Sequence, residues 1–580
     1  MSNNSLGCNT SGALDMRRLL LALAAGAGIG GAAQAVEIPS DNPDISMRWD
    51  NTVRYNLGVR ADQRTAIGNN PNFDESEYKF NRGDIVTNRV DLLSEFDFTW
   101  RQRYGFRVSA AGWYDNAYSN TSSKRNPDLP ASIAGSYIGD QYSNYTKRYY
   151  RGPSGEWLDA FIFGTFDIGG SPLALKLGRH TVYWGESLFS AVHGINYSQA
   201  PLDLAKGFAT PGVEAKELFR PLNQLSAQLV ASNELTLGAQ YFFDWGATRM
   251  PEGGTYLGPA DFFLYGSDRA SATLINTHAR EPKKAGDWGV NARWSPAWLD
   301  GTAGLYYRRV TDKIPGMLVT GGTRYGDYFG EGINLYGLSL AKQIGDLSVG
   351  MEASYRTNMP LVAQTLGFAG GAPALTPLLF PHGEPSLIGN TYQARGNTFH
   401  ALINAVGVIG NTPLFDAASW AAEVTYVRLN KLTANQDMYF GLGYGVCNAD
   451  RKAALGTRFK DKSDGCANRD STGLAINFTP SWLQVFPGVD VFAPLSYSRT
   501  LRGNAPVQLG GNEDNGSYSV GLAFDIDAKY RIDIKYVDYF GHVTEGPGVV
   551  PGTTQVTSVN GLSTLLKDRG FIAMTVKTTF

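Results

Sequence analysis

Apolar and polar residues alternate with a period of two along the first long segment after residue 40. One face of this segment holds Met47, Trp49, Val53, Tyr55, Leu57 and Val59. The other face holds Arg48, Asp50, Thr52, Arg54, Asn56, Gly58 and Arg60, and Asn51 breaks the pattern. This period predicts an extended strand. Because an Arg or Lys facing lipid at mid-bilayer costs about 2 to 4 kcal/mol, we expect the polar face to line a watery lumen.

The same alternation returns in residues 96–100, 530–536 and 572–580. Residues 157–166 and 333–340 have a β-rich composition without clean alternation, and we expect strands there as well. The last strand ends on Phe580, as outer-membrane assembly signals do. Because an unpaired edge strand exposes hydrogen-bonding groups, we expect this strand to pair with the first one and to close a barrel.

Short turns and long connections alternate along the chain. The turns lie near residues 103–105, 169–170, 232–233, 296–301, 345–346, 411–415, 487–488 and 527–528. The long connections cover residues 62–89, 119–155, 179–221, 246–286, 311–331, 356–397, 431–471, 501–516 and 542–569. They predict an all-β fold, a single transmembrane antiparallel β-barrel of about eighteen strands, or sixteen if boundaries shift. We expect the third long connection to fold inward.

Targeting and composition agree with export. Arg17 and Arg18 precede an apolar run over residues 19–29, and the triplet Ala33-Gln34-Ala35 follows. This pattern predicts a signal peptide over residues 1–35 and a barrel over residues 36–580, in the bacterial outer membrane. A membrane anchor is the alternative, and Met16 is an alternative start. The rest of the chain offers no run of 18 apolar residues, which argues against a helical membrane protein.

Charge and motifs exclude several classes of function. A net charge of -2 gives no basic field for nucleic acid. Neither G-x-S-x-G nor H-E-x-x-H occurs, and the six histidines are scattered, so we expect no enzyme, no cofactor and no metal site. The G-x-G-x-x-G match at residues 26–31 lies inside the signal peptide, and we treat it as chance. A barrel lipase stays an alternative.

Cys447 and Cys466 are the only cysteines that remain once Cys8 leaves with the signal peptide. In an oxidising compartment this pair predicts a disulfide. Closing a loop of this size is worth about 3 kcal/mol. The stretch between the two cysteines has no histidine, which argues against a metal site there.

The third long connection has the most distinctive sequence. Residues 178–187 read GRHTVYWGES, residues 194–196 read GIN, and residues 211–218 read PGVEAKEL. This stretch resembles the proteobacterial outer-membrane family of unknown function numbered 1302, and the resemblance extends over nearly the whole mature chain. It implies a barrel that moves hydrophobic compounds or lipids. It also implies a periplasmic or lipoprotein partner and an inner-membrane transporter of the resistance-nodulation-division type. The family has no agreed catalytic residues to carry over to this chain.

We expect this third connection to narrow the lumen. The residues that would line the constriction are Arg179, His180, Trp184, Glu186, Asp203, Glu214, Lys216 and Glu217. The alternative is that these charges only hold the loop in place, by pairing with lumen-facing side chains. The candidates for such pairing are Arg54, Arg60, Arg107 and Asp97.

Other connections are unusually apolar for an outer surface. They include residues 256–265 with Phe262, Phe263 and Leu264, residues 361–380 with Leu378, Leu379 and Phe380, and residues 317–319. Exposed apolar patches are typical of ligand or partner sites, so we expect these loops to receive a hydrophobic ligand. The alternative is that they pack on one another as a lid.

The sequence therefore predicts an outer-membrane channel or transporter for hydrophobic or amphipathic small molecules or lipids. About ten residues separate Val36 from the first strand, so we expect no plug domain. Energy would then come from a gradient or a separate partner. A hydrophilic substrate-specific porin is the first alternative, and a barrel-embedded lipase or esterase is the second.

Overall fold

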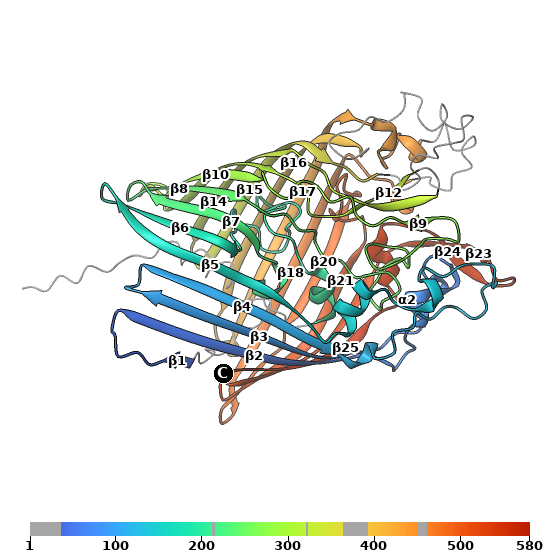
Figure 1. Ribbon diagram of the computed structural model, residues 1–580, viewed down its shortest axis with the longest axis horizontal. Helices are drawn as coiled ribbons and strands as arrows, with labels where there is room; N and C mark the ends of the chain where they lie inside the picture. Colours follow the sequence, from blue (N-terminus) through green and yellow to red (C-terminus); the bar gives the residue numbers. More distant parts are fainter. Residues whose placement is uncertain (1–35, 211–214, 321–322, 364–392, 449–460) are drawn as a thin grey trace, which may run out of the picture.

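The computed structural model describes residues 36–210, 215–320, 323–363, 393–448 and 461–580, which form one closed antiparallel β-barrel (Figure 1). Within these residues the barrel has eighteen strands, because β19 and β20 form one interrupted strand. The predicted number is confirmed, and so are the strands expected at residues 157–166 and 333–340. The predicted signal peptide lies outside the described residues.

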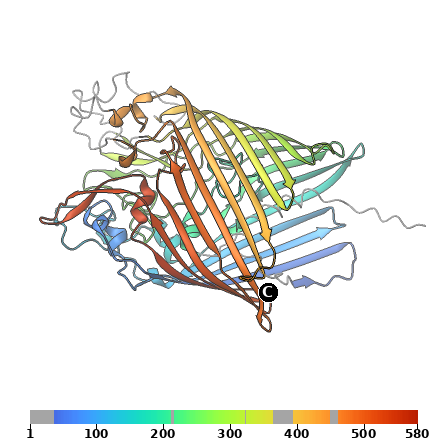
Figure 2. The same cartoon turned by 180° about the vertical axis from the view of Figure 1, so that it is seen from behind.

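The strands follow one another around the barrel in chain order. They are β2 (Ile45–Arg60), β3 (Ile85–Trp100), β4 (Tyr104–Asp115), β5 (Ser154–Ile168), β6 (Ser171–His180), β7 (Leu222–Val230), β8 (Leu235–Phe242), β10 (Trp288–Trp294), β11 (Gly301–Val310), β14 (Ile333–Ile344), β15 (Leu347–Pro360), β16 (Arg395–Ile409), β17 (Ala417–Ala434), β18 (Asp470–Phe486), β19 (Val489–Phe492) with β20 (Leu495–Arg502), β21 (Gly516–Ile526), β22 (Tyr530–Phe540) and β25 (Phe571–Thr579). Seen from behind, the strands coloured orange to red lie side by side in one wall (Figure 2).

The last strand closes the barrel against the first. β25 pairs with β2 from Thr52 opposite Thr579 to Arg60 opposite Phe571. Phe580 continues the ladder: its carbonyl accepts from the Asn51 amide at 2.7 Å, and its own amide donates to the Asn51 carbonyl at 3.0 Å. No edge of the barrel sheet is left open at this seam, as expected.

Tight turns gather at one end of the barrel and nine longer loops at the other (Figure 1). Loops 1 to 9 cover residues 61–84, 116–153, 181–221, 243–287, 311–332, 361–394, 435–469, 503–515 and 541–570. All eight predicted turns are present. Short elements outside the barrel strands are β1 (Val36–Ile38), β9 (Ile275–Asn276), β12 (Gly316–Thr320), β13 (Arg324–Tyr328), β23 (Val543–Pro547), β24 (Thr554–Val559), α2 (Asp74–Tyr78), α3 (Asn144–Thr146), α4 (Leu204–Ala209), α5 (Ala215–Leu218), η1 (Ala66–Asn69), η2 (Asn116–Tyr118), η3 (Ile138–Asp140), η4 (Lys147–Arg151), η5 (Gln436–Met438), η6 (Gly445–Cys447), η8 (Lys462–Asp464) and η9 (Leu562–Leu566).

The two faces of the strands point as predicted. On β2 the side chains of Arg54, Asn56 and Arg60 are buried inside the barrel, whereas Trp49 is exposed on the outer face. Leu305 of β11 and Ile572 of β25 are likewise exposed. An apolar band around a closed barrel is the surface that a β-barrel presents to lipid, so the protein is a barrel of the bacterial outer membrane. Among the described helices, none is long and apolar enough to cross a membrane.

Buried carboxyl groups tie loops 1, 2 and 4 together. Asp261 of loop 4 accepts from the Glu75 and Ser76 amides, at 2.8 and 3.0 Å, in the first turn of α2. Glu75 accepts from the Ser136 hydroxyl of loop 2 at 2.7 Å. Cys447 and Cys466 form the predicted disulfide, within loop 7. Loops 1, 2 and 4 therefore form a hydrogen-bonded cap at one end of the barrel.

This cap should loosen as the pH rises. Burial, together with the nearby Asp261, raises the pKa of Asp74 and of Glu75 to about 8. A pKa raised above its unfolded value stabilises the docked loops fully at low pH, and the contribution is lost as the pH rises through about 8. We expect hydrogen exchange in α2, corrected for intrinsic rates, to be faster at alkaline pH than at pH 6.

The Glu75→Gln variant is the control, because its amide oxygen still accepts from Ser136 but does not titrate. Its exchange should depend less on pH than that of the wild type. Equal pH dependence in the two proteins would contradict the role assigned to Glu75.

Candidate functional site

Loop 3, residues 181–221, runs from β6 into the lumen and returns to β7, as predicted. Its first half lies against β11, β14, β15 and β17. Its second half reaches Arg54 of β2, on another part of the wall. Loop 3 therefore bridges the inside of the barrel.

Two carboxylates of the barrel wall bind the backbone of this first half. Glu352 of β15 accepts from the Glu186 amide, from the Ser187 amide at 2.8 Å and from the Ile195 amide at 2.6 Å. Glu423 of β17 accepts from the amides of residues 188, 189 and 190 at 2.7, 3.2 and 2.8 Å. Both side chains are buried. A buried carboxylate is tolerated when donors surround it in this way.

Two wall arginines bind the carbonyls of the same segment. Arg308 of β11 donates to the carbonyls of Ile195 and Tyr197 at 2.8 and 2.7 Å. Arg356 of β15 donates to the carbonyls of Val192 and Gly194 at 2.7 and 2.9 Å. The segment around the Gly194-Ile195-Asn196 motif is thus held through its amides and its carbonyls at once.

Glycines on the inner face of the wall let loop 3 approach closely. A Cβ atom at Gly337 of β14 would lie 2.8 Å from Cγ1 of Ile195, and one at Gly289 of β10 would lie 2.8 Å from Cζ3 of Trp184. Both distances are shorter than ordinary van der Waals contact, so any larger residue would push the loop from the wall.

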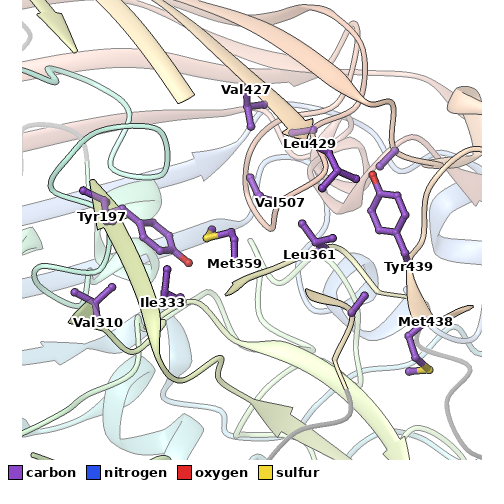
Figure 3. Close-up of a cluster of buried hydrophobic side chains, with 14 of the residues drawn as sticks. Tyr197, Val310, Ile333, Met359, Leu361, Val427, Leu429, Met438, Tyr439 and Val507 are labelled. Carbon is purple, nitrogen blue, oxygen red and sulfur yellow. The ribbon is translucent and has the colours of Figure 1, made fainter. Parts of the chain in front are cut away.

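Apolar side chains fill the space between loop 3 and the neighbouring loops. Figure 3 shows Tyr197 of loop 3 beside Ile333 and Met359 of the wall, in a buried cluster that continues to Leu361 and Tyr439. This part of the lumen is a packed core and is not a watery pore.

The second half of loop 3 is held by ion pairs. Asp203 pairs with Arg249 of loop 4 and accepts from the Lys206 amide at 3.0 Å, which caps α4. Glu217 pairs with Arg54 and with Lys206, whose Nζ lies 2.8 Å away. Burial tends to raise the pKa of Glu217, but Lys206 and Arg54 lower it below its ordinary value. Glu217 is therefore ionised at neutral pH.

A cavity of about 50 Å³ lies between loop 3, loops 2 and 4 and the wall of β3, β4 and β5. Aromatic rings and charged groups share its lining: Trp113, Tyr118, Tyr149, Tyr150, Tyr256 and Phe571, with Arg89, Asp115, Glu156, Asp203, Lys206 and Arg249. The Arg249 guanidinium lies 3.8 Å above the Tyr149 ring and binds Glu156 at 2.9 Å. Such a site offers apolar contact and charges of both signs.

The predicted constriction residues divide between loop 3 and its surroundings. Asp203 and Glu217 lie in the ion-paired half described above. Trp184 packs near Tyr306, and Glu186 accepts from the Ser339 hydroxyl at 3.3 Å. Glu214 lies outside the described residues, as does the side chain of Lys216.

Arg179 and His180 belong to β6 and not to the loop. The Nε2 atom of His180 lies 2.8 Å from the Ser226 hydroxyl, and its Nδ1 atom lies 3.0 Å from the Gly178 carbonyl oxygen. In a hydrolase a third group, usually a carboxylate, orients the histidine that acts as the base. At His180 the group beside Nδ1 is a backbone carbonyl, so His180 and Ser226 form a pair without the carboxylate of such a triad.

The apolar loop residues are partly buried. Leu264 is buried, and the Phe262 ring contacts Tyr325 of β13 at 6.3 Å between centroids. Phe263 is half-buried. Leu378, Leu379 and Phe380 lie outside the described residues. Packing within the cap therefore explains why Leu264 is apolar. A role in ligand entry remains a prediction for the other five residues.

Of the wall residues expected to hold the loop, Arg54 pairs with Glu217. Arg60 pairs instead with Glu77 of loop 1 at 2.6 Å, and Arg107 pairs with Asp97 of the neighbouring strand at 2.6 Å. The anchors Glu352, Glu423, Arg308 and Arg356 were missed. The sequence could have indicated each of them as a charged residue at an inward position of an alternating strand. That pattern does not show which part of the chain the residue binds.

Removing the Glu352 carboxylate should release loop 3. Glu352→Leu leaves three amides without their charge-assisted bonds, each worth about 1.5 to 3 kcal/mol. A loss of only 1.4 kcal/mol shifts an equilibrium about tenfold, so we expect at least about tenfold more frequent openings in planar-bilayer recordings. Glu352→Gln keeps an acceptor oxygen and should lie between the two.

Asp97→Asn is the matched control, because Asp97 faces the lumen but pairs with Arg107 and not with loop 3. It should open as rarely as the wild type. Wild-type gating in a folded Glu352→Leu barrel would show that this carboxylate does not brace the loop.

The chain is similar to several solved structures and matches one family model over most of its length. The crystal structure of Pseudomonas aeruginosa OpdK with vanillate shares 10% identity, with 92% of this chain and 98% of that chain covered, at a TM-score of 0.42. Acinetobacter baumannii OccAB1 shares 10% identity, with 95% and 99% covered, at 0.41. No curated protein matches the sequence. The model of a family described as "Protein of unknown function (DUF1302)" matches residues 16–580. The chain therefore belongs to the DUF1302 family, as the resemblance of its third connection indicated.

Proposed function

We propose that this protein is a selective, gated channel of the outer membrane for amphipathic or hydrophobic small molecules or lipids, and that it is not an enzyme. The observation that carries the proposal is the lumen-spanning loop 3 beside a cavity lined by aromatic rings and charges. A general aqueous pore needs no such lining, whereas a molecule with an apolar body and a charged group matches both kinds of contact.

Gating follows from the size of the cavity. A volume of about 50 Å³ holds only a few water molecules, so an organic molecule enters only when loop 3 or loop 4 moves. The Asp203–Arg249 pair joins these two loops. A ligand that offers its own charged group can replace one partner of such a pair, which gives the ligand a way to open its own path.

The lining of the cavity carries charges of both signs. Arg89, Lys206 and Arg249 oppose Asp115, Glu156 and Asp203 around the cavity. An amphipathic ligand of either charge therefore finds an oppositely charged partner in this lining. We further propose that the channel works with a periplasmic or lipoprotein partner and an inner-membrane transporter, as the family resemblance implies.

A hydrophilic substrate-specific porin is the second candidate. The observation that favours it is the charged inner face between loop 3 and the turns. Arg107 pairs there with Asp97, and Arg531 binds Asp525 and Asp533 at 3.0 Å each. Polar solutes would find a suitable surface in this region.

Flux into liposomes distinguishes the two candidates. We expect an aromatic carboxylate or an aromatic amine of the same ring size to cross at least about tenfold faster than glucose, a difference of about 1.4 kcal/mol. Tyr149→Ala removes a ring from the cavity and should reduce that preference about two- to tenfold, the range of one aromatic contact.

Tyr114→Ala is the matched control, because Tyr114 lies on the same wall but on its exposed outer face. Its flux should equal that of the wild type. Glucose crossing as fast as both aromatic probes would reject the amphipathic channel in favour of the hydrophilic porin.

A further inference from the structure

The outer surface of the barrel carries a hollow of about 980 Å³ across strands β6 to β16. Its lining is almost entirely apolar, and its volume is at the upper end of the range of small-molecule sites, about 300 to 1,000 Å³. Its lining includes Leu229, Leu237, Val290, Leu305, Tyr307, Tyr336, Leu338, Ala353 and Tyr355.

These side chains point to the membrane. Leu305 and Leu338 are 60% and 59% exposed, and they alternate along their strands with the buried residues Tyr306 and Gly337. The hollow is therefore separate from the cavity beside loop 3, on the other side of the wall. A barrel wall normally presents a convex surface to lipid, so a hollow here has to be filled by something apolar.

Three strands arrange the lining in rows of graded polarity. In the register of β11, β14 and β15, Tyr307 lies opposite Tyr336, and Tyr336 lies opposite Tyr355. The next row toward the turns is Leu305, Leu338 and Ala353. An aliphatic floor below a row of tyrosines matches the change from acyl chain to headgroup in a bilayer.

A cation lies at the loop end of these rows. Arg309 is exposed on the outer face of β11, opposite Asn334 of β14, which in turn lies opposite Thr357 of β15. The Asn334 side-chain oxygen accepts from the Tyr307 hydroxyl at 3.1 Å, and its amide nitrogen donates to the Thr357 hydroxyl oxygen at 3.2 Å. A guanidinium beside an amide and a hydroxyl is a suitable set of donors for a phosphate.

The same stretch of wall packs against loop 3 on its inner side. Gly337 and Gly289 leave no side chain between the wall and Ile195 or Trp184. The hollow on the outside and the close packing on the inside thus share strands β10 and β14.

We propose that this hollow binds the acyl chains of an anionic, phosphate-bearing lipid of the outer membrane, with the phosphate beside Arg309. The apolar floor, the tyrosine row and Arg309 then correspond to the acyl chain, the interface and the headgroup of one lipid. The site does not depend on the proposed channel function, because it lies on the other face of the wall.

Photo-crosslinking tests the site on the full-length protein in vesicles. The probe is phosphatidylglycerol with a diazirine near the middle of an acyl chain, and the products are mapped by peptide mass spectrometry. We expect labels to concentrate on β10, β11, β14 and β15. Ala353→Trp fills the floor of the hollow and should reduce this labelling on the order of tenfold, because the overfilled site excludes the chain.

Ala422→Trp is the matched control, since Ala422 is an outward alanine of β17 outside the hollow. It should leave the labelling of the hollow unchanged. Labels spread evenly around the barrel and insensitive to Ala353→Trp would mean ordinary surrounding lipid and would overturn the proposal. Cross-links between two protein chains across the hollow would overturn it as well, in favour of a second copy.

The headgroup is tested by the choice of lipid. Labelling of the hollow with the anionic probe should exceed that with a phosphatidylcholine probe about fivefold, the factor expected for one cation near an anionic headgroup. Arg309→Gln should remove this preference, whereas Arg428→Gln, at an exposed position of β17, should keep it. A preference unchanged in Arg309→Gln would reject the assignment of Arg309.

Discussion

Burying a loop inside a barrel requires partners for its backbone amides and carbonyls, because no bulk water reaches them. Loop 3 meets this requirement through side chains of the wall. Glu352 and Glu423 take six of its amides, and Arg308 and Arg356 take four of its carbonyls. These four residues fix where loop 3 crosses the lumen, and the neighbouring side chains pack around it.

Several features depend on where the loop is held. With its first half fixed to β11, β15 and β17, its second half reaches Arg54 on β2, and the cavity forms between that half and loop 4. Inward glycines allow the first half to lie close to the wall. The buried side chains of Arg308 and Arg356, which would otherwise line open water, instead bind the backbone of this loop.

Much of the architecture could be read from local pattern. Alternation with period two located the strands, turn residues located the hairpins, and the run that ends on Phe580 indicated where the barrel closes. These features depend on neighbours in the chain or on pairing between consecutive strands. The site was predicted less completely: Asp203 and Glu217 were named, but Arg249, which pairs with Asp203, and the anchors Glu352 and Glu423 were not.

The sequence by itself determined the barrel, its approximate number of strands, which face of the cleanly alternating strands meets lipid, and the pairing of Cys447 with Cys466. The tertiary structure alone decided which inward charge binds which loop, and that Leu264 is buried in the cap. The physical reason is the range of the interactions. A strand shows its two faces within a few residues, whereas the contact between Glu352 and Ile195 joins positions 157 residues apart, and only the closed barrel brings them together.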